Sequence, residues 1–239
     1  MSGLFGEIVH PSSRAFWNED DEEDDVGFDD AAKFTLEWSQ DIPKKFNTLI
    51  VAETHLIVDF VKDYVLNTSE NICNIKLSGS KNPSGIFKIN DDLYVCTVSA
   101  DVDLTVAGDF VESIHDVLMK TDNIIALTCN HISQLKTSVE SLEPSFMRSL
   151  STKKVSDIQK KFSPALKQPN IVSGVSAGVV AYSEAMNLSA TLNVLYLDGF
   201  EFDSETIQPL INIFEKLIKI KLTKFTTKKT NFNKGNLYM

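Results

Sequence analysis

Short apolar segments along the chain predict β-strands. Phe34–Trp38 alternates apolar and polar residues, as a half-buried strand does. Residues 46–52 and 124–129 are more continuously apolar, which is typical of strands covered on both faces of a sheet. Residues 93–98 and 190–198 also predict strands. The pattern therefore indicates a sheet whose middle strands are buried by other elements.

Apolar residues at helical spacing lie between these strands. Residues 56–64 and 110–118 each carry an apolar stripe of this kind. Residues 174–187 predict a helix of small residues that is able to pack closely on its neighbour. Residues 204–222 have the most regular amphipathic stripe of the chain, and Pro209 is expected in its first turns.

Two segments between these elements are less regular. Asn82–Gly85 has the composition of a turn. Residues 137–170 are interrupted by prolines, and we expect a surface excursion that contains a short helix around Phe146–Leu150. Leu77–Lys81 contains a glycine and a lysine but lacks the spacing of a phosphate-binding loop, so it is also expected to be a turn.

Alternation of strands and helices predicts an α/β fold, a single three-layer α/β/α domain with a mainly parallel sheet over residues 33–222. The two ends differ from this domain in composition. Residues 1–11 are expected to be a short docking segment, and residues 12–32 a disordered acidic linker. Residues 223–239 are polar and basic, which predicts a flexible C-terminal tail.

The net charge of −10 comes mostly from one segment, Glu19–Asp30, which holds nine acidic residues and no basic residue. From Lys216 onward the chain has seven lysines and no acidic residue. The acidic arm has two interpretations, a solvated spacer and an electrostatic handle for a basic partner surface. The basic tail resembles a nucleic-acid-binding pattern only faintly, and the acidic arm would compete with a polyanion; we expect no nucleic-acid partner.

Composition limits the environment of the protein. No apolar run approaches membrane-spanning length, Met1–Val9 has no secretory signal, and we expect no membrane partner. The three cysteines are too few and too scattered for a disulfide framework or a zinc site. We therefore expect a protein of the cytoplasm, and also of the nucleus, that has no metal site and no cofactor.

Two residue patterns suggest catalysis, and each has a simpler explanation. Gly174–Gly178 matches the G-x-S-x-G nucleophile elbow, but all four histidines precede Ser176, whereas that fold needs its histidine after the serine. Cys129 and His131 could share one face of a strand as a nucleophile and base, but a buried thiol followed by a turn histidine explains the same residues. The chain therefore favours an interaction protein, with an α/β enzyme or an acidic adaptor as alternatives.

The last three residues, Leu237, Tyr238 and Met239, follow the basic tail. They present an apolar side chain, a phenol and, at a chain end, a carboxylate. A receptor can bind such a trio with an apolar slot, a hydrogen-bond acceptor and a lysine or backbone N–H groups. The tail is therefore the candidate binding site.

Several segments in order along the chain carry a resemblance to a known family. They are Phe5–Val9 followed by the acidic stretch, Leu127–Cys129 with His131, Lys136–Ser138, Pro144 with Phe146–Arg148 and Leu150, Gln168–Val172, Ala177–Tyr182 and Leu237–Met239. With these, the sequence resembles the proteasome assembly chaperone 1 family. The resemblance covers most of the second half of the chain, and residues 33–120 match it only in their pattern of elements.

The resemblance implies a function without catalysis. Members of that family form a heterodimer with proteasome assembly chaperone 2, and the pair binds the α-ring of the 20S proteasome during assembly. The family's tail enters a pocket between adjacent α subunits. By this resemblance Leu237 would fill the apolar part, Tyr238 would hydrogen-bond at the pocket wall, and the Met239 carboxylate would pair with a lysine.

Overall fold

The computed structural model describes residues 34–67, 69–137, 143–160, 162–199, 202–220 and 222. All of them belong to one compact unit, Ala32–Met239. The predicted docking segment (1–11), acidic linker (12–32) and basic tail (223–239) lie outside the described residues.

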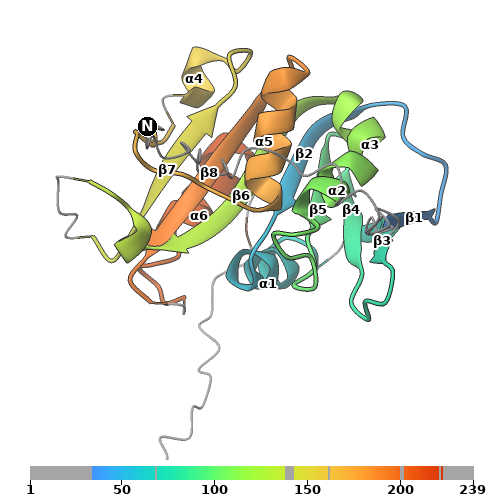
Figure 1. The fold of residues 1–239 in the computed structure, drawn as a ribbon, viewed down its shortest axis with the longest axis horizontal. Helices are drawn as coiled ribbons and strands as arrows, with labels where there is room; N and C mark the ends of the chain where they lie inside the picture. The colour runs from blue at the N-terminus through green and yellow to red at the C-terminus, as the bar shows by residue number, and fades with distance from the viewer. Residues whose placement is uncertain are drawn as a thin grey trace, which may run out of the picture. The chain divides into compact units, whose positions relative to one another are not determined.

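A single mixed sheet of eight strands in the order β1-β3-β4-β5-β2-β6-β8-β7 organises the described residues (Figure 1). Its strands are β1 (Phe34–Trp38), β2 (Phe46–Ala52), β3 (Glu70–Leu77), β4 (Ser84–Asn90), β5 (Leu93–Thr97), β6 (Thr121–His131), β7 (Ser145–Ser151) and β8 (Ala190–Leu197). The helices are α1 (His55–Tyr64), α2 (Ala107–Ser113), α3 (His115–Met119), α4 (Asp157–Lys160), α5 (Val175–Ala185) and α6 (Gln208–Asn212), with a 3₁₀ turn at Ile132–Gln134 and a π-helical turn at Ile213–Leu217.

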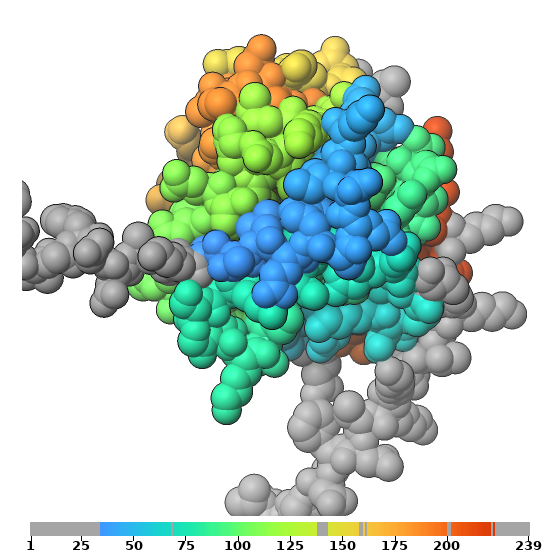
Figure 2. All heavy atoms as spheres, turned by 90° about the vertical axis from the view of Figure 1, so that its right-hand side faces the viewer, coloured from blue at the N-terminus to red at the C-terminus, as the bar shows by residue number. Residues whose placement is uncertain are grey.

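The α/β class is confirmed, and the parallel pairings form the centre of the sheet. Strands β5, β2, β6 and β8 pair in parallel. The remaining pairings, β1 with β3, β3 with β4, β4 with β5 and β7 with β8, are antiparallel. The prediction of a mainly parallel sheet therefore holds for the four central strands, and the sheet as a whole is mixed. Figure 2 shows the side of the molecule at which β1, in blue, forms the edge.

Four local predictions were wrong or incomplete. The helix expected at residues 204–222 is shorter, because α6 spans Gln208–Asn212 and a π-helical turn follows at Ile213–Leu217. The expected short helix at Phe146–Leu150 is strand β7, which pairs with β8. The expected turn at Asn82–Gly85 already includes the first residues of β4. Strand β3 was missed because its pairing with β4 shifts register between Asn71 and Cys73, which breaks the apolar–polar alternation.

Helices cover both faces of the sheet, as the three-layer prediction requires. Alternate residues of β2 show this, because Leu49 and Val51 face a core shared with α2 and α5. Ile50 and Ala52 face a second core, shared with α1 and α6. Burying one such aliphatic side chain contributes about 1.5–3 kcal/mol, so both cores hold the central strands in place.

Candidate functional site

The predicted binding residues Leu237, Tyr238 and Met239 lie outside the described residues. The structure does describe the two patterns that suggested catalysis. It also reveals a crevice at the carboxyl ends of β2 and β5.

Ser176 of the apparent nucleophile elbow is a structural residue. It is fully buried in the first turn of α5, and its Oγ donates a hydrogen bond to the carbonyl oxygen of Leu127 (3.2 Å). The prediction of a helix rich in small residues is confirmed. Its close packing is also confirmed, because a Cβ added at Gly178 would lie 3.1 Å from Cγ2 of Val111 on α2.

The start of α5 is held by Glu53, at the end of β2. One carboxylate oxygen accepts the Val175 N–H (2.7 Å) and the other accepts the Ser176 N–H (2.9 Å). These N–H groups have no partner inside the helix, and a carboxylate there also interacts favourably with the helix dipole. Gly174 has φ of +100°, and a Cβ at this position would overlap the Glu53 carboxylate. Glycine is therefore required at position 174 for two reasons: the positive φ, and the short distance to the Glu53 carboxylate.

The contacts of Cys129 and His131 favour structural roles over those of a nucleophile and base. The Cys129 Sγ lies 3.2 Å from Thr54 Oγ1, and burial raises the pKa of the thiol. The ring nitrogens of His131 interact with Ser133 Oγ (2.7 Å) and the Asp198 carbonyl oxygen (2.9 Å). The interpretation as a buried thiol and a turn histidine is the one that the geometry favours.

The same burial is expected to make all three cysteines slow to react. Burial raises the pKa of Cys96 to about 12 and that of Cys73 to about 11, and all three thiols are buried and free. Because the thiolate is the reactive form, we expect iodoacetamide to label the native protein slowly at neutral pH and the urea-unfolded protein rapidly at all three positions. Mass spectrometry of timed samples measures this, and rapid labelling of Cys129 in the native state would contradict it.

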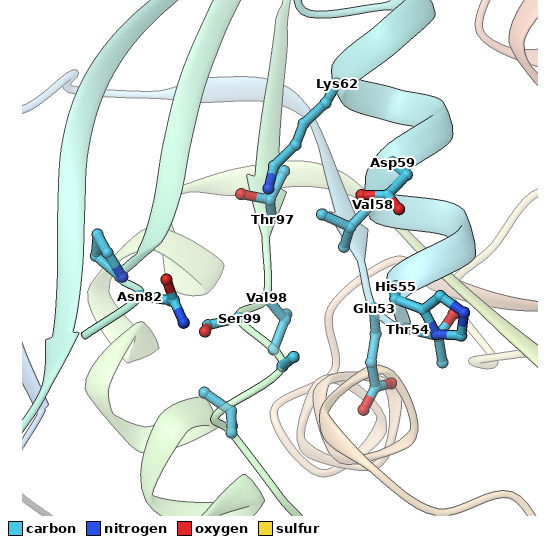
Figure 3. A pocket seen from close by; sticks show the side chains of 13 residues that line it. Glu53, Thr54, His55, Val58, Asp59, Lys62, Asn82, Thr97, Val98 and Ser99 are labelled. Atoms are coloured by element: carbon cyan, nitrogen blue, oxygen red, sulfur yellow. The ribbon is translucent and has the colours of Figure 1, made fainter. Parts of the chain in front are cut away.

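A crevice of about 450 Å³ opens where the chain leaves β2 and β5 (Figure 3). These strands are parallel neighbours, yet α1 follows β2 on one face of the sheet and α2 follows β5 on the other. Diverging connections of this kind leave a gap at the carboxyl ends of the strands, a common position for ligand sites in α/β folds.

Both walls of the crevice carry polar groups. His55, Asp59 and Lys62 lie three and four residues apart on α1 and line one side. Asn82 and Ser99 lie across from them in Figure 3. Both are tied to Asp101: its carboxylate accepts the Asn82 N–H (3.3 Å), and its own N–H donates to Ser99 Oγ (3.2 Å). The arrangement can offer hydrogen bonds and charges to a small polar molecule, but it contains no assembled nucleophile–base pair among the described residues.

Backbone strain marks the same place. Thr54 joins β2 to α1 with φ of 69°, a conformation that is unusual for a β-branched residue. Such strain costs on the order of 1–3 kcal/mol and often lies at functional positions. Sequence reasoning missed this crevice, although an acidic residue directly after a buried strand, as Glu53 is after β2, was a usable signal.

Comparison with known proteins identifies the family. The PAC1 family model, described as Proteasome assembly chaperone 4, matches residues 1–235. The chain belongs to this proteasome assembly chaperone family. The resemblance seen in the sequence is thereby confirmed, and family membership favours a binding role over catalysis.

Relatives of known name agree with this assignment. Proteasome assembly chaperone 1 from Bos taurus is 25% identical, over 86% of this chain and 85% of its own length. The protein of that name from Homo sapiens is 31% identical over 51% of this chain and 42% of its own length. The human match therefore spans less than half of that relative.

Solved structures support the fold alone. Pyrococcus furiosus PbaA, an archaeal homolog of proteasome-assembly chaperone, superposes with a TM-score of 0.57 at 13% identity, over 80% of this chain and 88% of its own. PbaB from the same organism, an archaeal proteasome activator, gives a TM-score of 0.58 at 9% identity, over 80% of this chain and 91% of its own. Among the described residues, no helix is long and apolar enough to cross a membrane.

Proposed function

We propose that this chain pairs with proteasome assembly chaperone 2 as a heterodimer, binds 20S proteasome α subunits and promotes assembly of the α-ring. The observation that carries the proposal is the family match over residues 1–235, together with relatives named proteasome assembly chaperone 1. The structure is consistent with a binding protein, because the two candidate catalytic patterns, at Ser176 and at Cys129 with His131, serve packing and local hydrogen bonds.

The C-terminal residues are the proposed contact with the ring. Leu237 fills an apolar slot between adjacent α subunits, Tyr238 donates a hydrogen bond, and the Met239 carboxylate pairs with a lysine. A contact of three residues is much smaller than a stable protein interface. The partner chaperone therefore supplies a second contact, which raises the effective concentration of the tail at the ring.

Deletion of Leu237–Met239 tests the tail. We expect recovery of α subunits by the heterodimer to fall at least about tenfold, because the apolar anchor and terminal charge are both lost. The unfolding midpoint should not change, because the deleted residues follow the α/β domain. The readout is affinity capture of purified α subunits by a recombinant heterodimer in which this chain ends at Met239.

Two matched variants sharpen this test. An added tag after Met239 moves the carboxylate away and should weaken capture, whereas Asn231→Ala, in the same tail, should leave it unchanged. Undiminished capture by the truncated chain would exclude the tail as the ring contact.

A further inference from the structure

The crevice at the carboxyl ends of β2 and β5 contains a buried hydroxyl group that the fold leaves without a partner. Thr97, the last residue of β5, is only 5% exposed and lines the crevice. Its hydroxyl has no hydrogen-bond partner in the part of the chain that the structure describes. Burying a hydroxyl without a hydrogen bond costs free energy, and such groups are uncommon in native proteins. The position therefore points to a bound molecule as the missing partner.

Lys62 supplies a positive charge to the same space. It lines the crevice from α1, and Figure 3 shows its side chain extending toward Thr97. Among the described residues, its ammonium group has no ion pair or hydrogen bond. Thr97 and Lys62 thus present an O–H and an N–H donor from two walls of one crevice. A carboxylate accepts hydrogen bonds from both kinds of donor, and its bond to an ammonium group is charge-assisted.

The acidic side chains of the crevice limit the ligand to a single negative charge. The Glu53 carboxylate already accepts the N–H groups of Val175 and Ser176, and Figure 3 shows it pointing away from Lys62. Asp59 lies one helical turn before Lys62 and is exposed. Both carboxylates would repel a doubly charged phosphate, with one lysine to compensate. A monocarboxylate needs only the one positive charge that Lys62 offers.

The rest of the crevice suits a short apolar body. Val58, Val98 and Val102 line it, and the first two are only 6% and 5% exposed. Its volume of about 450 Å³ falls within the range of small-molecule sites, which combine mostly apolar walls with a few polar groups that fix the orientation of the ligand. A short aliphatic chain can therefore pack between α1 and the residues that follow β5.

We propose that this crevice binds a small organic monocarboxylate. The carboxylate accepts hydrogen bonds from the Thr97 hydroxyl and the Lys62 ammonium group, and the apolar body packs against Val58, Val98 and Val102. This site is additional to the proposed contact of the C-terminal residues with the ring, and it does not depend on that contact.

Probes of similar shape and different charge test the ligand class. Hexanoate, hexanamide and hexylamine have a similar size, and at neutral pH they carry a negative charge, no charge and a positive charge. We expect only hexanoate to give saturable shifts of the backbone amide signals of Thr97, Val98 and Ser99. The measurement is an NMR titration of the isotopically labelled full-length chain, which suits a ligand so small that it binds weakly.

Substitutions on both walls test the two donors. Thr97→Val keeps the shape of the side chain and should raise the dissociation constant for hexanoate about tenfold. It should not lower the unfolding midpoint, because the lost hydroxyl has no partner among the described residues. Lys62→Gln should weaken binding by a similar factor, whereas Asp59→Asn removes a repelling charge and should strengthen it. Lys120→Gln is the matched control and should change nothing, because this exposed lysine precedes β6, at the opposite end of the parallel strands.

Three results would overturn the site. Absence of saturable shifts at the crevice with hexanoate would exclude it, and tighter or equal binding of hexanamide or hexylamine would exclude a site for an anion. Equal binding of hexanoate to the unmodified chain, Thr97→Val and Lys62→Gln would show that hexanoate binds elsewhere. None of these results bears on the capture of α subunits, so this site and the proposed function are tested separately.

Discussion

Replacing Glu53 with alanine is expected to lower the free energy of unfolding by about 2–4 kcal/mol, because two charge-assisted hydrogen bonds are lost. The Glu53 carboxylate accepts the N–H groups of both Val175 and Ser176, and it connects β2 to the start of α5 across more than 120 residues of sequence. Without it, both N–H groups lose their acceptors at a helix end that has no side-chain cap of its own.

Glu53→Gln separates hydrogen bonding from charge. The amide oxygen of glutamine can still accept a hydrogen bond from one of the two N–H groups. We therefore expect the free energy of unfolding to fall by about half as much as in Glu53→Ala. Asp59→Ala is the matched control, because the Asp59 carboxylate also lines the crevice but is exposed on α1. This substitution should change the free energy of unfolding by no more than about 0.5 kcal/mol. Urea denaturation monitored by circular dichroism measures all three, and equal losses for Glu53→Ala and Asp59→Ala would contradict the assigned role.

This contact also shows where sequence reasoning reached its limit. The strand β2 was predicted with the observed bounds, since Phe46–Ala52 is nearly continuously apolar. Glu53, the next residue, bonds to a helix start more than 120 residues away, and no local period of residues records such a partner. The sequence Gly174–Gly178 matches a nucleophile elbow, but its glycine has a structural cause. Gly174 leaves room for the Glu53 carboxylate, and only the structure shows this contact.

The missed elements have a similar cause. In β7, Phe146 and Met147 are both buried although they face opposite cores, so adjacent apolar residues resembled a helix in a proline-interrupted region. Gly85 looked like part of a turn, but it lies inside β4 beside the Phe87 ring. In both places tertiary packing overrides local preference. The tail prediction is different in kind, because its basis was the resemblance and the residues at Leu237–Met239.

The second large effect is expected at Phe214, in the π-helical turn that follows α6. Its side chain is fully buried, and the centroid of its ring lies 5.5 Å from the ring centroid of Phe60 on α1. Phe214→Ala removes a large side chain that anchors the last described helix to the sheet. We expect the free energy of unfolding to fall by about 3–5 kcal/mol, as for other buried phenylalanines. Denaturant unfolding measures the change.

Neighbouring positions provide the controls that assign this loss to packing. Glu215→Ala changes an exposed residue of the same turn and should alter stability by less than about 0.5 kcal/mol. Phe60 is only 3% exposed, so Phe60→Ala is also strongly destabilising. The two rings are in contact, so their contributions to stability should not add. We expect the double variant to lose about 0.5–1.5 kcal/mol less free energy of unfolding than the sum of the two single variants. Strictly additive losses would show that the rings are anchored independently, and that α6 is held by the rest of its apolar stripe.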